Sequence, residues 1–103
     1  MEKFSNSRLA ETFLAEAWIG DGVLALWARL RVLADIGSVC GEQYTRLTSN
    51  QFLNAFGEPT SVEASIGRLY TERGLQAAFE WMDGTLLPLF RKQQANRVRK
   101  GKI

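Results

Sequence analysis

The sequence predicts an all-α protein built as one domain, and three observations lead to this fold class. The 103 residues are enough for one hydrophobic core and little else. Hydrophobic residues make up 46% of the chain, and they recur every three or four positions, which is the period of a helix face. Nowhere do β-branched residues alternate with polar ones over a length that would indicate a sheet.

The first predicted helix covers residues 8–36, with Ser7 as its N-cap and Gly37 directly after its end. Inside it, the Gly-Asp-Gly sequence at 20–22 is a turn signal, because a helical glycine costs about 1 kcal/mol relative to alanine. Two explanations remain open: two helices meet here, or one helix continues because another segment packs closely against it. The second explanation would place Asp21 at a tight helix contact, where an unpaired carboxylate is costly unless a cation is bound.

The middle of the chain is predicted to be helical as well. Residues 38–41 form a connection, and a second helical segment covers 42–56 with a possible interruption at 48–50. The Gly-Glu-Pro sequence at 57–59 is a clear break, since proline cannot continue a preceding helix.

The third and fourth helical segments follow this break. Thr60 and Glu63 have the spacing of a capping box, which predicts Thr60 as the N-cap of a helix that Gly74 closes. A last helix then runs toward the C-terminus, and we expect it to be bent or divided at 83–84 or at Pro88. The final segment, 91–103, either continues or follows this helix.

Charge is distributed unevenly along the chain. Residues 1–90 contain seven basic and eleven acidic residues, a net charge of −4, whereas residues 91–103 carry +6. A basic tail on an acidic body predicts a polyanionic partner, although a solvated terminus would have the same composition. The candidate RNA-binding residues are the six bases of the tail, Arg91, Lys92, Arg97, Arg99, Lys100 and Lys102.

Composition also excludes several function classes. The chain has no histidine and a single cysteine, Cys40, so it contains no histidine-based triad, no internal disulfide and no zinc site of the Cys/His kind. It has no uninterrupted apolar run of about 18 residues and no signal-peptide pattern, which predicts no membrane partner and a cytoplasmic location. Carboxylates and hard metal ions remain as the candidate chemistry.

Two carboxylates stand out as candidates for that chemistry. Asp21 lies between glycines in an apolar run, and Glu63 precedes the small or apolar residues 64–67. Small neighbours would let two helices approach and bring both carboxylates together, as in an Mg²⁺ or Mn²⁺ site. Two structural explanations compete with this hypothesis: Asp21 as a turn or cap residue, and Glu63 as the capping partner of Thr60.

Three segments resemble the catalytic domain of the ribonuclease III family, in the family's order. Residues 14–24, LAEAWIGDGVL, resemble its signature helix, which ends in Leu/Ile-Gly-Asp-x-Val. Residues 47–53, LTSNQFL, are similar to its Leu-Val-Ser-Asn segment, and residues 62–70, VEASIGRLY, are similar to its Phe-Glu-Ala-Leu-Ile-Gly-Ala-Leu-Tyr segment. The resemblance spans roughly residues 10–90 and favours a continuous helix through Gly20-Asp21-Gly22.

The resemblance implies a ribonuclease III-like helical domain over residues 1–90, without a double-stranded-RNA-binding domain. It makes Asp21 and Glu63 the catalytic and metal-binding residues, with Mg²⁺ or Mn²⁺ as the cofactor. The full-length enzymes have two further carboxylates, at the positions of Ala17 and Thr60. Small residues there resemble the mini-ribonuclease III branch, although the basic connection of that branch is reduced here to residues 54–59.

These observations predict a divalent-metal-dependent endoribonuclease that acts on double-stranded or structured RNA. The family's dimers pack through the signature helix, so the resemblance also implies a homodimer, with Trp18, Ile19 and Gly22 in its interface. The alternative is a catalytically silent dimer of the same kind that binds RNA or a ribonucleoprotein. A third explanation is a plain helical interaction module whose resemblance to the family is accidental.

Overall fold

The computed structural model describes residues 2–101, with side chains described for residues 8–99, and this part of the chain contains helices and no strand. The all-α prediction is therefore confirmed for the described residues. The elements are α1 (Glu2–Ile36), α2 (Gly41–Thr48), α3 (Asn50–Phe56), α4 (Pro59–Arg73) and α5 (Leu75–Gly101).

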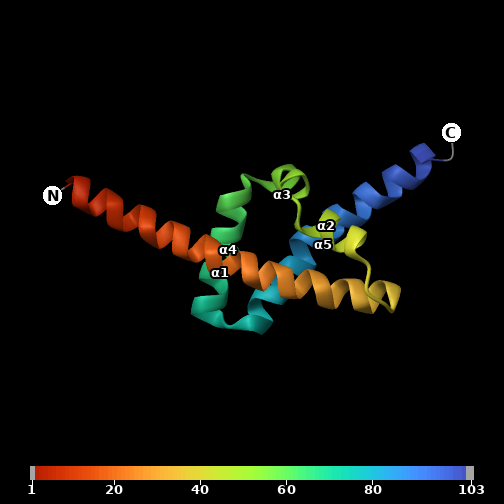
Figure 1. Cartoon of the computed structure of the whole chain (residues 1–103), viewed down its shortest axis with the longest axis horizontal. Helices are drawn as coiled ribbons and strands as arrows, with labels where there is room; N and C mark the ends of the chain where they lie inside the picture. Colours follow the sequence, from red (N-terminus) through yellow and green to blue (C-terminus); the bar gives the residue numbers. More distant parts are fainter. Residues whose placement is uncertain (1, 102–103) are drawn as a thin grey trace.

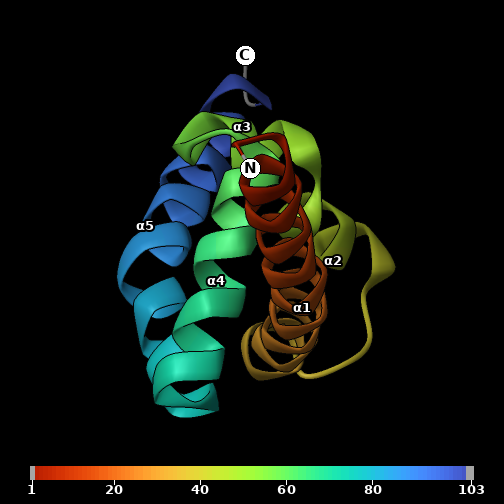
Figure 2. The same ribbon diagram turned by 90° about the vertical axis from the view of Figure 1, so that its left-hand side faces the viewer.

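Two long helices and the helix between them set the shape, which measures 59 × 28 × 22 Å. α1 crosses α4 near its middle, and the N-terminal part of α1 and the C-terminal part of α5 project at opposite ends (Figure 1). Seen from the end, α4 lies between α1 and α5, α2 lies on the far side of α1 from α4, and α3 lies at the top of the view (Figure 2). The crossing of α1 and α4 is the feature that positions the candidate site.

The first helix is longer than predicted at its start and ends where predicted. α1 begins at Glu2, so the prediction of Ser7 as its N-cap is wrong: the preceding residues continue the helix. It passes unbroken through the Gly-Asp-Gly sequence at 20–22, which excludes a turn there. Gly37 ends it with a φ of +84°, and its N–H donates to the carbonyl oxygen of Leu33 at 2.9 Å.

The predicted interruption at 48–50 is confirmed and has a simple cause. Ser49 has extended backbone angles and serves both as the C-cap of α2 and as the N-cap of α3. Its hydroxyl oxygen accepts a hydrogen bond from the backbone N–H of Phe52 at 3.1 Å. One serine thus ends one helix and starts the next.

The capping box predicted for Thr60 and Glu63 is wrong. Glu58 is the N-cap of α4, and its carboxylate accepts hydrogen bonds from the backbone N–H groups of Thr60 at 2.8 Å and Ser61 at 3.0 Å. Pro59 occupies the first helical position, which favours proline because its missing N–H would have had no partner there. Glu63 is consequently free of any capping role, and Gly74 ends α4 as predicted.

The last helix is not divided. α5 is continuous from Leu75 to Gly101 with Pro88 inside it, so the expected break before the basic tail is absent and residues 91–101 extend the helix. Leu86, Leu87 and Phe90 flank the proline and are all buried. Their burial outweighs the roughly 3 kcal/mol that an interior proline costs.

The core lies where α1, α4 and α5 meet and is closed by α2 and α3. Trp27 is 3% exposed, and its ring N–H donates to the Asp83 carboxylate at 2.8 Å, which ties α1 to α5. No helix within residues 2–101 is both long and apolar enough to cross a membrane. The largest fully buried side chains are Leu24, Leu47, Leu53, Ile66, Met82 and Leu86.

Candidate metal centre

The candidate site depends on a direct backbone contact between α1 and α4. A Cβ at Gly20 would lie 1.7 Å from the carbonyl oxygen of Glu63, and a Cβ at Gly67 would lie 1.9 Å from that of Glu16. No side chain fits at either position, so each helix presents a glycine to the backbone of the other. Gly22 meets nothing within 4 Å, which shows that only the first glycine of the Gly-Asp-Gly sequence is required by this contact.

An ion pair holds the same crossing one turn away. Arg68 of α4 donates from Nε and Nη2 to the two carboxylate oxygens of Glu16 on α1, each at 3.1 Å. The hydrogen bond from Arg68 and its positive charge hold the pKa of Glu16 below its usual value. This two-pronged geometry fixes the relative rotation of the helices beside the glycine contact.

The crossing brings Asp21 and Glu63 together, as the sequence predicted. Because Gly20 packs on the backbone of Glu63, the next residue, Asp21, lies close enough to interact with the Glu63 side chain. Partial burial, the side-chain interaction with Asp21 and the negative charges of Asp21 and Glu58 together raise the pKa of Glu63 to about 7. Glu63 is therefore partly protonated near neutral pH, beside the carboxyl group of Asp21.

The ligand set around this pair is small. Ala17 and Thr60, which lie one helical turn before Asp21 and Glu63, offer no carboxylate. Among the described residues, no group of three or more acidic, cysteine or histidine side chains is arranged to hold one ion. A cation at this point would therefore have two protein carboxylates and water, a combination that Mg²⁺ accepts.

Glu58 also affects the carboxyl pair, and the sequence did not lead us to expect this. Its charge acts on Glu63, although its own carboxylate is occupied at the start of α4. Hydrogen bonds from Thr60 and Ser61 lower the pKa of Glu58, so it remains ionised beside the pair. The signal was present in the sequence, because proline at the first helical position places the N-cap one residue earlier.

The predicted RNA-binding bases whose side chains are described have different surroundings. Arg91 approaches Asp35 at 3.9 Å, Arg97 lines a pocket against α2 and α3, and Arg99 donates to the side-chain oxygen of Asn96. Lys92 is exposed. Of the remaining two, only the backbone of Lys100 is described, and Lys102 lies outside the described residues.

Trp18, which the sequence analysis assigned to a dimer interface, is 82% exposed on α1. Leu14, one turn earlier, is 60% exposed, and Ile19 beside it is 39% exposed. A large aromatic residue with this exposure contributes nothing to the core of the single chain.

Comparison with protein-family models, with curated proteins and with solved structures finds no match for this chain.

Proposed function

We propose that this chain is a divalent-metal-dependent endoribonuclease that acts on double-stranded or structured RNA as a homodimer. The observation that carries the proposal is the Asp21–Glu63 carboxyl pair at the glycine crossing of α1 and α4. These are the two residues that the resemblance to the ribonuclease III family makes metal-site residues, and they lie 42 positions apart in the sequence.

The donor set fits a hard divalent cation. Two carboxyl groups whose negative charges repel each other are a site where Mg²⁺ or Mn²⁺ can bind and neutralise both charges. Asp21 and Glu63 would hold the ion, directly or through water. When bound, it would supply the Lewis acidity that activates water and stabilises a phosphodiester transition state.

The surface around the pair agrees with a homodimer. Trp18 and Leu14 lie on the helix that carries Asp21, and both are more than half exposed. Tryptophan is the residue type that most often dominates binding energy at protein interfaces. A second copy of the chain packed on this face would bring a second carboxyl pair into the same assembly.

A catalytically silent dimer that binds RNA is the second candidate, and one observation favours it. The described residues provide only two carboxylates at the site, because Ala17 and Thr60 stand where the full-length enzymes have two more. Such a dimer would keep the RNA-binding bases of α5 without hydrolysing the phosphodiester bond.

Cleavage of long duplex RNA with Mg²⁺ or Mn²⁺ separates these candidates. Asp21→Asn and Glu63→Gln keep side-chain volume and remove the charge that holds the ion, so each should lower the cleavage rate about 100-fold or more. Glu72→Gln is the matched control, since it removes an exposed carboxylate from the same helix as Glu63 and should leave the rate unchanged. Folded wild type that cleaves with neither ion would favour the silent dimer.

Metal binding can be measured without RNA. Mn²⁺ should raise the melting temperature of the wild type, because a ligand that binds only the folded state stabilises it. The same addition should have no effect on Asp21→Asn or Glu63→Gln. Equal shifts in all three proteins would show that the ion binds elsewhere.

A further inference from the structure

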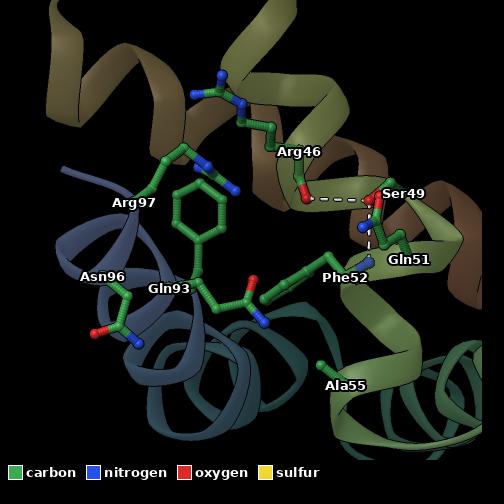
Figure 3. A pocket seen from close by; sticks show the side chains of 9 residues that line it. Arg46, Ser49, Gln51, Phe52, Ala55, Gln93, Asn96 and Arg97 are labelled. Atoms are coloured by element: carbon green, nitrogen blue, oxygen red, sulfur yellow. Dashed lines mark hydrogen bonds between the residues drawn. The ribbon is translucent and has the colours of Figure 1, made fainter. Parts of the chain in front are cut away.

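A second site lies away from the carboxyl pair, between the α2–α3 corner and the C-terminal half of α5. It is a pocket of about 570 Å³, within the range of about 300–1,000 Å³ that is usual for small-molecule sites (Figure 3). No residue of α1 or α4 lines it, so it is separate from the Asp21–Glu63 pair.

The pocket has a net positive lining. Arg46 of α2 and Arg97 of α5 reach toward the same side of it in Figure 3, and no acidic side chain lines it. Arg97 has no hydrogen-bond or ion-pair partner within the described part of the chain. Arg46 pairs with Glu42 at 2.5 Å. Exposed ion pairs one helical turn apart contribute little to stability, so a bound anion can take the place of Glu42. Two guanidinium groups and no carboxylate favour an anionic ligand, and phosphate is the group that this fork geometry matches best.

The remaining lining combines apolar side chains with side-chain amides, a mixture suited to a heterocycle. Gln93 extends from α5 toward α3 in Figure 3, and Gln51 faces the pocket from α3. Neither side-chain amide has a hydrogen-bond partner among residues 8–99. An amide that offers both a donor and an acceptor can pair with the edge of a nucleobase, as glutamine does with adenine.

The pocket is also rigid at its base. Phe52 of α3 and Phe90 of α5 are buried beneath it and meet edge to face, with ring centroids 5.5 Å apart. Aromatic pairs in this geometry add stability beyond the area that they bury. The helix segments that carry the arginines and amides are therefore held by core packing, and none of these side chains comes from a loop.

We propose that this pocket binds a nucleoside 5′-monophosphate, with Arg46 and Arg97 at the phosphate and Gln51 and Gln93 at the base. The ligand is either a free nucleotide or the phosphorylated 5′ end of an RNA strand. The RNA source rests on the proposed function, since it would give the nuclease a second grip on its substrate. The nucleotide chemistry rests on the pocket alone.

A titration with adenosine 5′-monophosphate in EDTA tests the pocket without metal or cleavage. Side-chain amide NMR signals of Gln51 and Gln93 should shift and saturate, whereas inorganic phosphate or adenosine alone should bind about tenfold more weakly. Arg97→Gln should weaken binding about tenfold, because it removes the guanidinium that has no other partner. Arg73→Gln makes the same charge change on an exposed residue of α4 and should alter binding less than twofold.

Competition by a short RNA strand then identifies the source of the ligand. A 5′-phosphorylated strand that displaces the nucleotide, while its 5′-hydroxyl counterpart does not, supports recognition of an RNA end. Displacement by neither strand supports a free nucleotide. The proposal is overturned if the nucleotide does not saturate the signals, or if Arg97→Gln and Arg73→Gln weaken binding equally. If Asp21→Asn no longer cleaves RNA but binds the nucleotide as the wild type does, the pocket acts independently of the carboxyl pair.

Discussion

The contact between α1 and α4 and the contact of α5 with α2 and α3 are built in different ways. On the α1 side, backbones touch: Gly20 and Gly67 leave no room for a side chain, and the carboxyl pair follows from that contact. On the α2–α3 side, α5 is held through side chains, by the edge-to-face contact of Phe52 with Phe90 and a hydrogen bond from Gln94 to Gln43 at 3.2 Å. A backbone contact leaves little freedom in the distance between two helices and in the positions of the residues beside the contact. Contacts through side chains hold helices farther apart, which leaves space for a pocket.

This difference predicts that the crossing tolerates far less change than the pocket. Gly20→Ala should be the most damaging substitution, because its Cβ would lie 1.7 Å from a backbone oxygen that cannot move aside alone. We expect a loss of about 3 kcal/mol or more in the free energy of unfolding, measured with urea.

Gly22→Ala is the control on the same helix. Its Cβ would meet nothing within 4 Å, so the gain in helix propensity should stabilise the protein by about 0.5–1 kcal/mol. Similar losses of stability in both variants would contradict a backbone contact at Gly20.

The sequence was sufficient to predict the crossing but not the pocket. Asp21 and Glu63 could be paired because glycine and small residues next to each carboxylate signal a close helix approach, and the family resemblance selected the same two residues. The pocket draws on α2, α3 and α5, and glutamine and arginine on a helix have no local pattern that distinguishes a ligand site from a solvated face.

The sequence-based errors are local and have physical causes. Glu58, and not Thr60, is the N-cap of α4, because Pro59 fits the first helical position. The expected break at Pro88 is absent because the buried residues on both sides hold the helix together. In both cases a rule about one residue was outweighed by its neighbours or by core packing.

The exposed side chains of α1 allow a test of a third kind of contact, the one between two copies of the chain. If Trp18 anchors a homodimer, Trp18→Glu should raise the dissociation constant about thirtyfold or more, as removal of an interface tryptophan usually does. Val98→Glu is the control, since Val98 is 59% exposed on α5, away from this face. Sedimentation should give about twice 11.6 kDa for wild type and control, and a wild type that remains at 11.6 kDa would exclude the dimer.

The smallest expected effect concerns the protonation of Glu63 at the crossing, and its measurement requires neither RNA nor metal. Folding raises the pKa of Glu63 from 4.5 to about 7, so the folded state binds this proton more tightly than the unfolded state. The contribution of Glu63 to stability is therefore complete below pH 4.5 and is lost as the pH rises through about 7. Because the pair is open to solvent, the loss should be about 1 kcal/mol, less than an unscreened shift would give.

Urea unfolding in EDTA between pH 4.5 and pH 8 measures this loss directly. Glutamine cannot lose a proton, so Glu63→Gln should match the wild type near pH 4.5 and become the more stable protein by about 1 kcal/mol near pH 8. Asp21→Asn should reduce the pH dependence, because it removes a negative charge that raises the pKa of Glu63. Wild type and Glu63→Gln with parallel stability profiles would show that folding does not raise the pKa of Glu63, and the metal proposal would then lose the contact on which it depends.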